Sequence, residues 1–159
     1  MPTPNSTAYA LAMVHSWQVE QHTSASITQV WDTLVDATRW NEWGRFKIAK
    51  YERVGDIHIH GVGAVRVFGN PPMLSREQVV AFEPHTHFAY KMLSGLPIDG
   101  YRADVHLEAT PTGTNIKWKS SFVAARPNFT GPFFAWFLRK FIEDTAKRLV
   151  KHAELTNSR

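Results

Sequence analysis

Two residues of opposite charge flank the Gly-Asn-Pro-Pro stretch at residues 69–72. Arg66 and Glu77 lie on the strand-like segments to either side, and a tight turn between them would place the two close to opposite each other. If both side chains face inward, they form a buried ion pair, which is often functional. If both face outward, they form a surface pair worth little. A register shift of one residue decides between the two, so they are only weak candidates for catalytic residues.

Histidines recur in two His-x-His pairs, His58 with His60 and His85 with His87. On a strand, the two residues of such a pair share a face and can reach one metal ion. No carboxylate is patterned with either pair, and His85 and His87 fall at a predicted turn. We therefore expect solvent-facing histidines, no metal site and no cofactor.

The composition excludes several classes of protein. The 159 residues include no cysteine, so there is no disulfide, thiol nucleophile or thiolate metal site, and a cytoplasmic location is expected. The sequence contains neither a Gly-x-Ser-x-Gly motif nor a phosphate-binding loop. The net charge of +4 comes from dispersed basic residues, so no nucleic-acid partner is expected.

The chain is expected to form one domain over residues 14–156, after a flexible N-terminal leader over residues 1–13. The leader lacks the basic region and cleavage site of a signal peptide. No stretch approaches the roughly 18 apolar residues of a transmembrane helix, so stable membrane insertion is not expected.

Apolar spacing predicts a helix over Ala25–Asp36, begun by a capping box between Ser26 and Gln29. A second, very short helix is expected over Thr38–Trp43. The first helix buries Trp31. Trp40 follows the end of this helix and is expected to be either a lid contact or a simple packing residue.

The centre of the chain alternates between apolar and polar residues, which is typical of strands with one covered face and one wet face. Short turns between the runs favour an antiparallel meander. Strands are expected at Phe46–Val54, Ala64–Phe68, Met73–Phe82, His87–Met92, Tyr101–Ala109 and Thr114–Phe122.

A long C-terminal helix is expected over Gly131–Glu154, with Thr130 as its N-cap. Its apolar stripe consists of Phe134, Leu138, Phe141, Ile142, Thr145 and Leu149. Phe133 and Trp136 fall off this stripe. They are either covered by the preceding ARPNFTGP segment or exposed, and exposure would indicate a homodimer contact or transient membrane docking.

Taken in order, these segments resemble the START-like, Bet v 1-like (SRPBCC) superfamily, and within it the bacterial polyketide cyclase/dehydrase and lipid-transport group. The resemblance covers nearly the whole chain after about Val14. The matching stretches are ASITQVWDTLVDATRWNEW (25–43), GVGAVRVFG (61–69), REQVVAFEPHTHFAY (76–90), GTNIKWKSSF (113–122) and the final helix.

The resemblance implies an α+β helix-grip fold. In this fold a seven-stranded antiparallel sheet curls around the long C-terminal helix, with two short helices after the first strand. It also implies a hydrophobic cavity between sheet and helix that holds a small apolar ligand, lipid-like or aromatic and polyketide-like. The residues expected to bind this ligand are Trp43, Tyr90, Tyr101, Trp118, Ser120, Phe134, Leu138, Phe141 and Thr145.

Three functions remain open on the sequence. Binding or transport of the apolar ligand comes first, a cyclase or dehydratase second, and a protein-interaction module without a ligand third. An open apolar cavity favours carriage, an inward charged pair favours catalysis, and a filled core favours interaction. Aromatic side chains of this size are also able to close the cavity entirely.

Overall fold

The computed structural model describes residues 13–124 and 130–157. A long strand comes first, two short helices follow, six strands make up the middle, and a 28-residue helix ends the chain. The elements are β1 (Val14–Thr23), α1 (Ile27–Val35), the 3-10 turn η2 (Ala37–Arg39), α2 (Trp40–Trp43), β2 (Ile48–Arg53), β3 (Val65–Asn70), β4 (Met73–Glu83), β5 (His87–Ser94), β6 (Asp99–Thr110), β7 (Gly113–Val123) and α3 (Thr130–Asn157).

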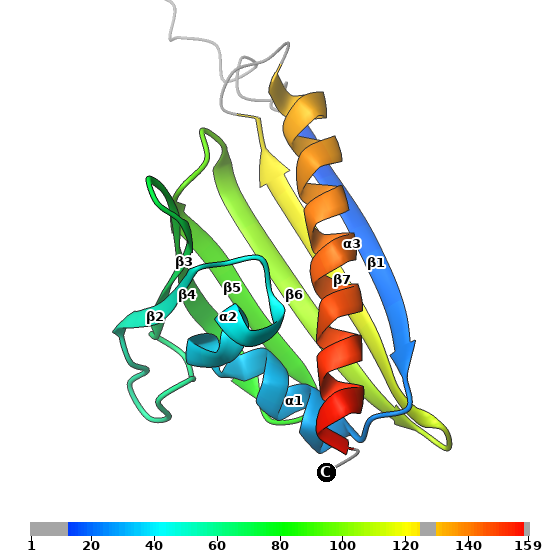
Figure 1. Cartoon of the computed structure of the whole chain (residues 1–159). Coiled ribbons are helices and arrows are strands. Elements are labelled where there is room, and N and C mark those ends of the chain that lie inside the picture. The colour runs from blue at the N-terminus through cyan, green and yellow to red at the C-terminus, as the bar shows by residue number, and fades with distance from the viewer. Residues whose placement is uncertain (1–12, 125–129, 158–159) are drawn as a thin grey trace, which may run out of the picture.

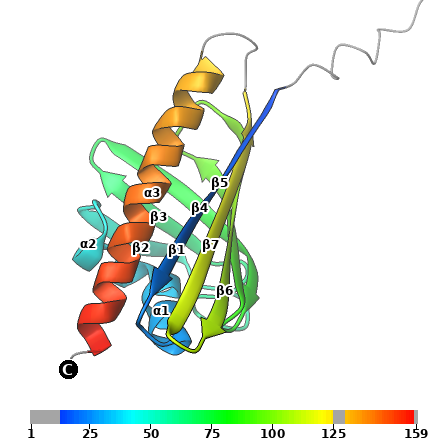
Figure 2. The ribbon, with the colours of Figure 1, turned by 90° about the vertical axis from the view of Figure 1, so that its right-hand side faces the viewer.

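The seven strands form one antiparallel sheet in the order β1-β7-β6-β5-β4-β3-β2. The chain runs through β2 to β7 as a meander, and β1 joins the far edge beside β7. Helix α3 crosses one face of the sheet, while α1 and α2 lie near its C-terminal end (Figures 1 and 2). This arrangement confirms the predicted helix-grip fold and its two short helices.

Helix α1 forms where the sequence pattern places it. The Ser26 side chain accepts a hydrogen bond from the Gln29 backbone N–H, and the Gln29 side chain accepts one from the Ser26 backbone N–H. Val30, Trp31 and Leu34 are buried on its inner face. Trp31 packs edge-on against Phe82 and Phe88, which confirms that it belongs to the core.

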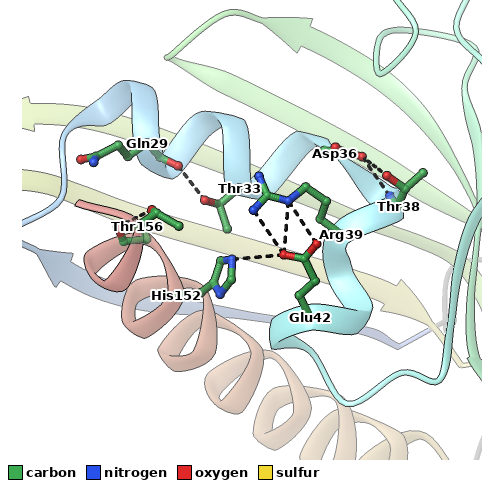
Figure 3. A network of polar contacts seen from close by, with 9 residues as sticks. Gln29, Thr33, Asp36, Thr38, Arg39, Glu42, His152 and Thr156 are labelled. Atoms are coloured by element: carbon green, nitrogen blue, oxygen red, sulfur yellow. Dashed lines mark hydrogen bonds and ion pairs between the residues drawn. The ribbon is translucent and has the colours of Figure 1, made fainter. Parts of the chain in front are cut away.

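A polar network joins the short helices to α3 (Figure 3). Glu42 of α2 pairs with Arg39 at 3.2 Å and lies 3.7 Å from the imidazole of His152 on α3. Asp36 caps η2 by accepting hydrogen bonds from the Thr38 backbone and hydroxyl. The C-terminal half of α3 is thereby held against the segment that contains Trp40 and Trp43.

The turn between β3 and β4 sets the register of the two strands. Gly69, the residue before the end of β3, has φ at +146°, and a Cβ there would lie 2.2 Å from the Met73 carbonyl oxygen. Only glycine allows the backbones to approach so closely. The hairpin then aligns Arg66 of β3 directly opposite Glu77 of β4.

Helix α3 differs slightly from its predicted bounds. It begins at Thr130, so this residue is helical and not the N-cap, and it runs beyond Glu154 to Asn157. Phe133 and Trp136 are 55% and 60% exposed. The ARPNFTGP segment lies partly, and the predicted leader almost wholly, outside the described residues. Within the described part of the chain, none of the helices combines the length and apolar character that crossing a membrane requires.

We predict that replacing Ser26 by alanine lowers the free energy of unfolding by about 1 kcal/mol, because the first turn of α1 loses its side-chain cap. Urea unfolding of S26A and T28A measures this, since Thr28 is an exposed residue of the same helix that makes no cap. Equal stabilities of the two variants would contradict the assignment of the cap.

Candidate ligand-binding cavity

A cavity of about 350 Å³ lies between α3 and the middle of the sheet. Strands β3 to β7 provide its floor, and α3 covers it with one face of its central turns. Trp40 of α2 and Phe46 of the following loop close one side. Its volume is within the range of about 300–1,000 Å³ that is usual for small-molecule sites.

Aromatic rings form much of the cavity wall. Trp40 stacks on Phe68 at 4.8 Å between ring centroids, and Phe46 stacks on Phe68 at 5.2 Å. Phe141 of α3 contacts Phe46 at 5.7 Å. The Trp40 indole N–H donates to the Leu34 carbonyl oxygen, so this ring is fixed in place and presents only its apolar surface. These flat surfaces suit a ligand that contains rings.

Arg66 is the largest charged side chain in the interior, and it is fully buried. Its guanidinium carbon lies 4.6–5.1 Å from the ring centroids of Trp40, Phe68, Phe88 and Tyr90. Each of these contacts is a cation–π interaction that partly replaces the hydration of the charge. Arg66 therefore lies behind the cavity wall, enclosed by the same rings that form it.

Glu77 links the buried Arg66 to the cavity surface. Arg66 Nη2 donates to Glu77 Oε2 at 2.8 Å, and the Glu77 side chain lines the cavity while Arg66 does not. Both residues thus face inward, which resolves the alternative that the sequence left open. Burial raises the pKa of Glu77, although the charge of Arg66 and its hydrogen bond oppose that rise.

Two tyrosines lie beside Glu77 at the closed end of the cavity. The Tyr101 hydroxyl donates to Ser120 Oγ at 3.4 Å, and Tyr90 and Tyr101 contact each other. Burial raises the pKa of both phenols, so both hydroxyls keep their protons at neutral pH. They offer a ligand O–H donors and neutral acceptors.

Several buried polar atoms at this end make no hydrogen bond to the described residues. They are Ser75 Oγ and Trp118 Nε1 on the cavity wall, and Arg66 Nε and Nη1 behind it. Burial raises the pKa of Tyr90 overall, and the nearby Trp118 indole N–H opposes that rise. The indole N–H does not, however, reach hydrogen-bond geometry with the Tyr90 hydroxyl. An unsatisfied buried polar group costs about 1–3 kcal/mol. The two atoms on the wall therefore favour a ligand that places a polar group beside them.

The structure brings together most of the predicted binding residues. Six of the nine line the cavity: Tyr90, Tyr101, Trp118, Leu138, Phe141 and Thr145. Trp43, Ser120 and Phe134 do not line it. Trp43 is buried against Trp40, Ser120 is reached through the Tyr101 hydroxyl, and Phe134 packs on the core nearly one turn before the cavity begins.

Other residues also form the wall. Trp40 was expected only as a lid or packing residue, and Phe46 and Phe68 were not singled out from the sequence. Met92 and Leu96 of the β5–β6 region and Phe137 of α3 join them. The aromatic density of residues 31–46 is the sequence signal for Trp40 and Phe46. Phe68 and Met92 look like ordinary strand residues, and nothing local distinguishes them.

The two histidines of each His-x-His pair have different surroundings, although His58 and His60 contact each other with ring centroids 5.3 Å apart. The expectation of solvent-facing histidines is wrong for His60, His85 and His87, which are half-buried. His58 is exposed and stacks on Phe82, whereas His60 is half-buried and bonded to the Tyr51 hydroxyl. His85 sits in the turn with φ at +64°, against Trp31. His87 turns away to Asp104 on β6.

Solved structures of known proteins share the fold at low sequence identity. Ara h 8.0201 matches with a TM-score of 0.72 and 14% identity, covering 89% of this chain and 98% of its own. Norcoclaurine synthase from Thalictrum flavum, solved with dopamine and hydroxybenzaldehyde, matches with a TM-score of 0.62 and 16% identity, covering 96% and 95%. The di-domain ARO/CYC StfQ of the steffimycin biosynthetic pathway matches with a TM-score of 0.68 and 14% identity, covering 92% of this chain and 52% of its own.

Comparison at the level of sequence families gives one match. The family model described as polyketide cyclase / dehydrase and lipid transport matches residues 14–154. A search of curated proteins finds no significant match.

We predict that replacing Arg66 by methionine raises the pKa of Glu77 further. The variant removes both causes that lower this pKa and leaves the burial that raises it. Neutral Glu77 favours the folded state, so R66M is relatively most stable at acid pH and loses stability as pH rises through the raised pKa.

Carbon-13 NMR titration of the Glu77 carboxyl measures the shift. R76M is the matched control, because Arg76 lies next to Glu77 in the chain but pairs with the exposed Glu52. An unchanged Glu77 pKa in R66M would show that the ion pair does not set the charge state of the cavity.

Proposed function

Because the chain belongs to the polyketide cyclase/dehydrase and lipid-transport family, we propose that it binds a small, mainly apolar molecule in the cavity between the sheet and α3. One observation carries the proposal. The cavity has a ring-lined apolar body and a buried polar end formed by Glu77, Tyr90, Tyr101, Trp118 and Ser75, and it is also lined by Arg45, Asn70 and Thr145. A site of this kind gains affinity from apolar burial and orientation from a few polar contacts.

The polar end indicates the chemistry of the ligand. Glu77 Oε2 is taken by Arg66, and Oε1 makes no hydrogen bond to the described residues, so it is available to accept one. Among the described residues, Trp118 Nε1 finds no acceptor for its proton. A hydroxyl group satisfies both, since it donates to Glu77 and accepts from Trp118. We therefore favour a ring-containing ligand with a hydroxyl, such as a phenol or enol, over a plain hydrocarbon.

The mouth of the cavity is apolar as well. Phe137 on α3 and Met73 and Leu74 at the β3–β4 turn line the cavity, and all three are exposed. Phe137 also stacks between Phe133 and Phe141, so a row of rings leads along α3 from the surface inward. Apolar side chains therefore extend from the rim into the cavity, although Arg45 and Asn70 also line it.

We predict that L138W weakens binding of the uncharged fluorescent probe N-phenyl-1-naphthylamine by at least about tenfold, which corresponds to about 1.4 kcal/mol. The larger ring occupies part of the cavity that Leu138 lines. L155W is the control, because Leu155 is on the same helix but exposed and away from the cavity. Equal affinities in the two variants, measured by fluorescence titration, would place the probe elsewhere.

Catalysis on the bound molecule is the second candidate function, and the raised pKa of the inward Glu77 favours it. A carboxylate with a raised pKa is a stronger base toward a proton of a ligand, and the Tyr90 hydroxyl is placed to donate to a developing oxyanion. This chemistry matches a cyclisation or dehydration through an enol.

We predict that E77Q binds the ligand extracted from the native protein but turns it over at least about 100-fold more slowly than the unsubstituted chain. Mass spectrometry of the reaction mixture gives both quantities. E52Q is the control, since Glu52 is exposed and pairs with Arg76. If the unsubstituted chain returns every bound molecule chemically unchanged, the catalytic candidate fails and the carrier proposal stands.

A further inference from the structure

A second group of titratable side chains lies on the face of the sheet opposite α3. Residues of β6 alternate strictly: Tyr101, Ala103, Val105 and Leu107 are buried toward the helix, and Arg102, Asp104 and His106 point the other way. On neighbouring β5, Phe88 and Tyr90 face inward, and His87 points outward beside His106. The cavity and this outer cluster therefore share two strands and no side chain.

Strand register brings the three outer residues together. His87 and His106 are direct cross-strand partners, and their imidazole rings are parallel within 3° with centroids 4.3 Å apart. Asp104 is two residues before His106 on the same face, and its Oδ1 lies 2.8 Å from His87 Nε2. One ligand atom from each of the three residues lies within 4.8 Å of the other two.

We propose that His87, Asp104 and His106 form a binding site for a divalent first-row transition-metal ion, with Zn²⁺ as the reference ion. Two imidazole nitrogens and one carboxylate oxygen are a ligand set that suits zinc, nickel or copper, whereas magnesium and calcium prefer oxygen alone. Three protein ligands leave a fourth position for water. Glu83, whose carboxylate is 3.8 Å from His87 Nδ1, is on the side of the ring away from Asp104 and is placed to accept from the imidazole nitrogen that does not bind the ion.

The backbone provides the preorganisation that such a site needs. Facing residues of an antiparallel pair hold their Cβ atoms about 4.5–5.5 Å apart, so two imidazoles converge on one ion after small rotations of their rings. Rigid paired strands also limit the entropy lost on binding.

Positive charges around the cluster set its affinity. Arg102 donates from Nε to Asp104 Oδ2 at 2.8 Å and from Nη2 to Oδ1 at 2.9 Å. Lys117 and Lys119 of β7 pair in register with His106 and Asp104, and Lys91 of β5 pairs with Arg102. A metal ion that takes Oδ1 displaces only the second of the two Arg102 bonds, while Oδ2 remains neutralised. Arg102 therefore competes with the ion, and its removal must strengthen binding.

Calorimetric titration of ZnCl₂ into the untagged full chain tests the site. We expect one ion per chain, with affinity reduced at least about tenfold in H106A, because even partners outside the ligand shell are worth about 10- to 100-fold. H22A is the control, since His22 is an exposed β1 histidine bonded to Asn115 and Thr112, outside the cluster. R102Q is expected to bind Zn²⁺ more tightly than the unsubstituted chain.

Histidine NMR gives an independent readout of the same event. Zn²⁺ is expected to shift the imidazole signals of His87 and His106 and to leave those of His22 unchanged. Equal affinities of H106A and H22A, or an R102Q variant that binds Zn²⁺ no better than the unsubstituted chain, would overturn the proposal and leave a surface network of hydrogen bonds and ion pairs. Circular dichroism of each variant confirms that it is folded.

Discussion

The buried ion pair between Arg66 and Glu77 is the constraint on which the rest of the interior depends. An unpaired charge in this position costs about 3–5 kcal/mol, so the surrounding structure has to hold both partners in place. The Gly69 turn sets their register, and four rings enclose the guanidinium. Glu77 alone of the two reaches the cavity. The pair thus fixes where the apolar wall ends and where polar recognition begins.

The fold draws stability and recognition from the same elements. Strands β5 and β6 bury aromatic residues toward α3, and the hydroxyls of Tyr90 and Tyr101 remain at the cavity's closed end. Helix α3 contributes core residues such as Ile142 and Leu149 along the same face that covers the cavity. The Glu42–His152 contact lies between α2 and that helix, and the hydrogen bond from the Trp40 indole N–H to the Leu34 carbonyl oxygen keeps Trp40 in the wall. A cavity remains because the rings stack on one another along its sides and do not fill its centre.

Local patterns were sufficient to predict most of the individual elements, and the resemblance to the superfamily implied how they assemble. The capping box at Ser26, the alternation along β6 and β7 and the stripe on α3 each follow from the spacing of a few neighbouring residues. The site depends on longer-range geometry. The inward direction of Glu77 could be predicted only with the strand register known. Helix α2 is too short for its periodicity to show that Trp40, and not Trp43, faces the cavity. Phe134 belongs to the predicted stripe, but the cavity begins one turn later at Phe137. The outer cluster of His87 and His106 joins two segments that are 19 residues apart, and no local motif reveals it.

Native mass spectrometry of the protein, purified gently from its own host, tests the central claim most directly. The account predicts a population that carries one small organic molecule per chain, with a mass and fragmentation pattern that indicate rings and at least one hydroxyl. A protein that shows only the unliganded mass, and takes up no molecule when it is mixed with an organic extract of the same host, would contradict the account and would favour a role in protein interaction instead.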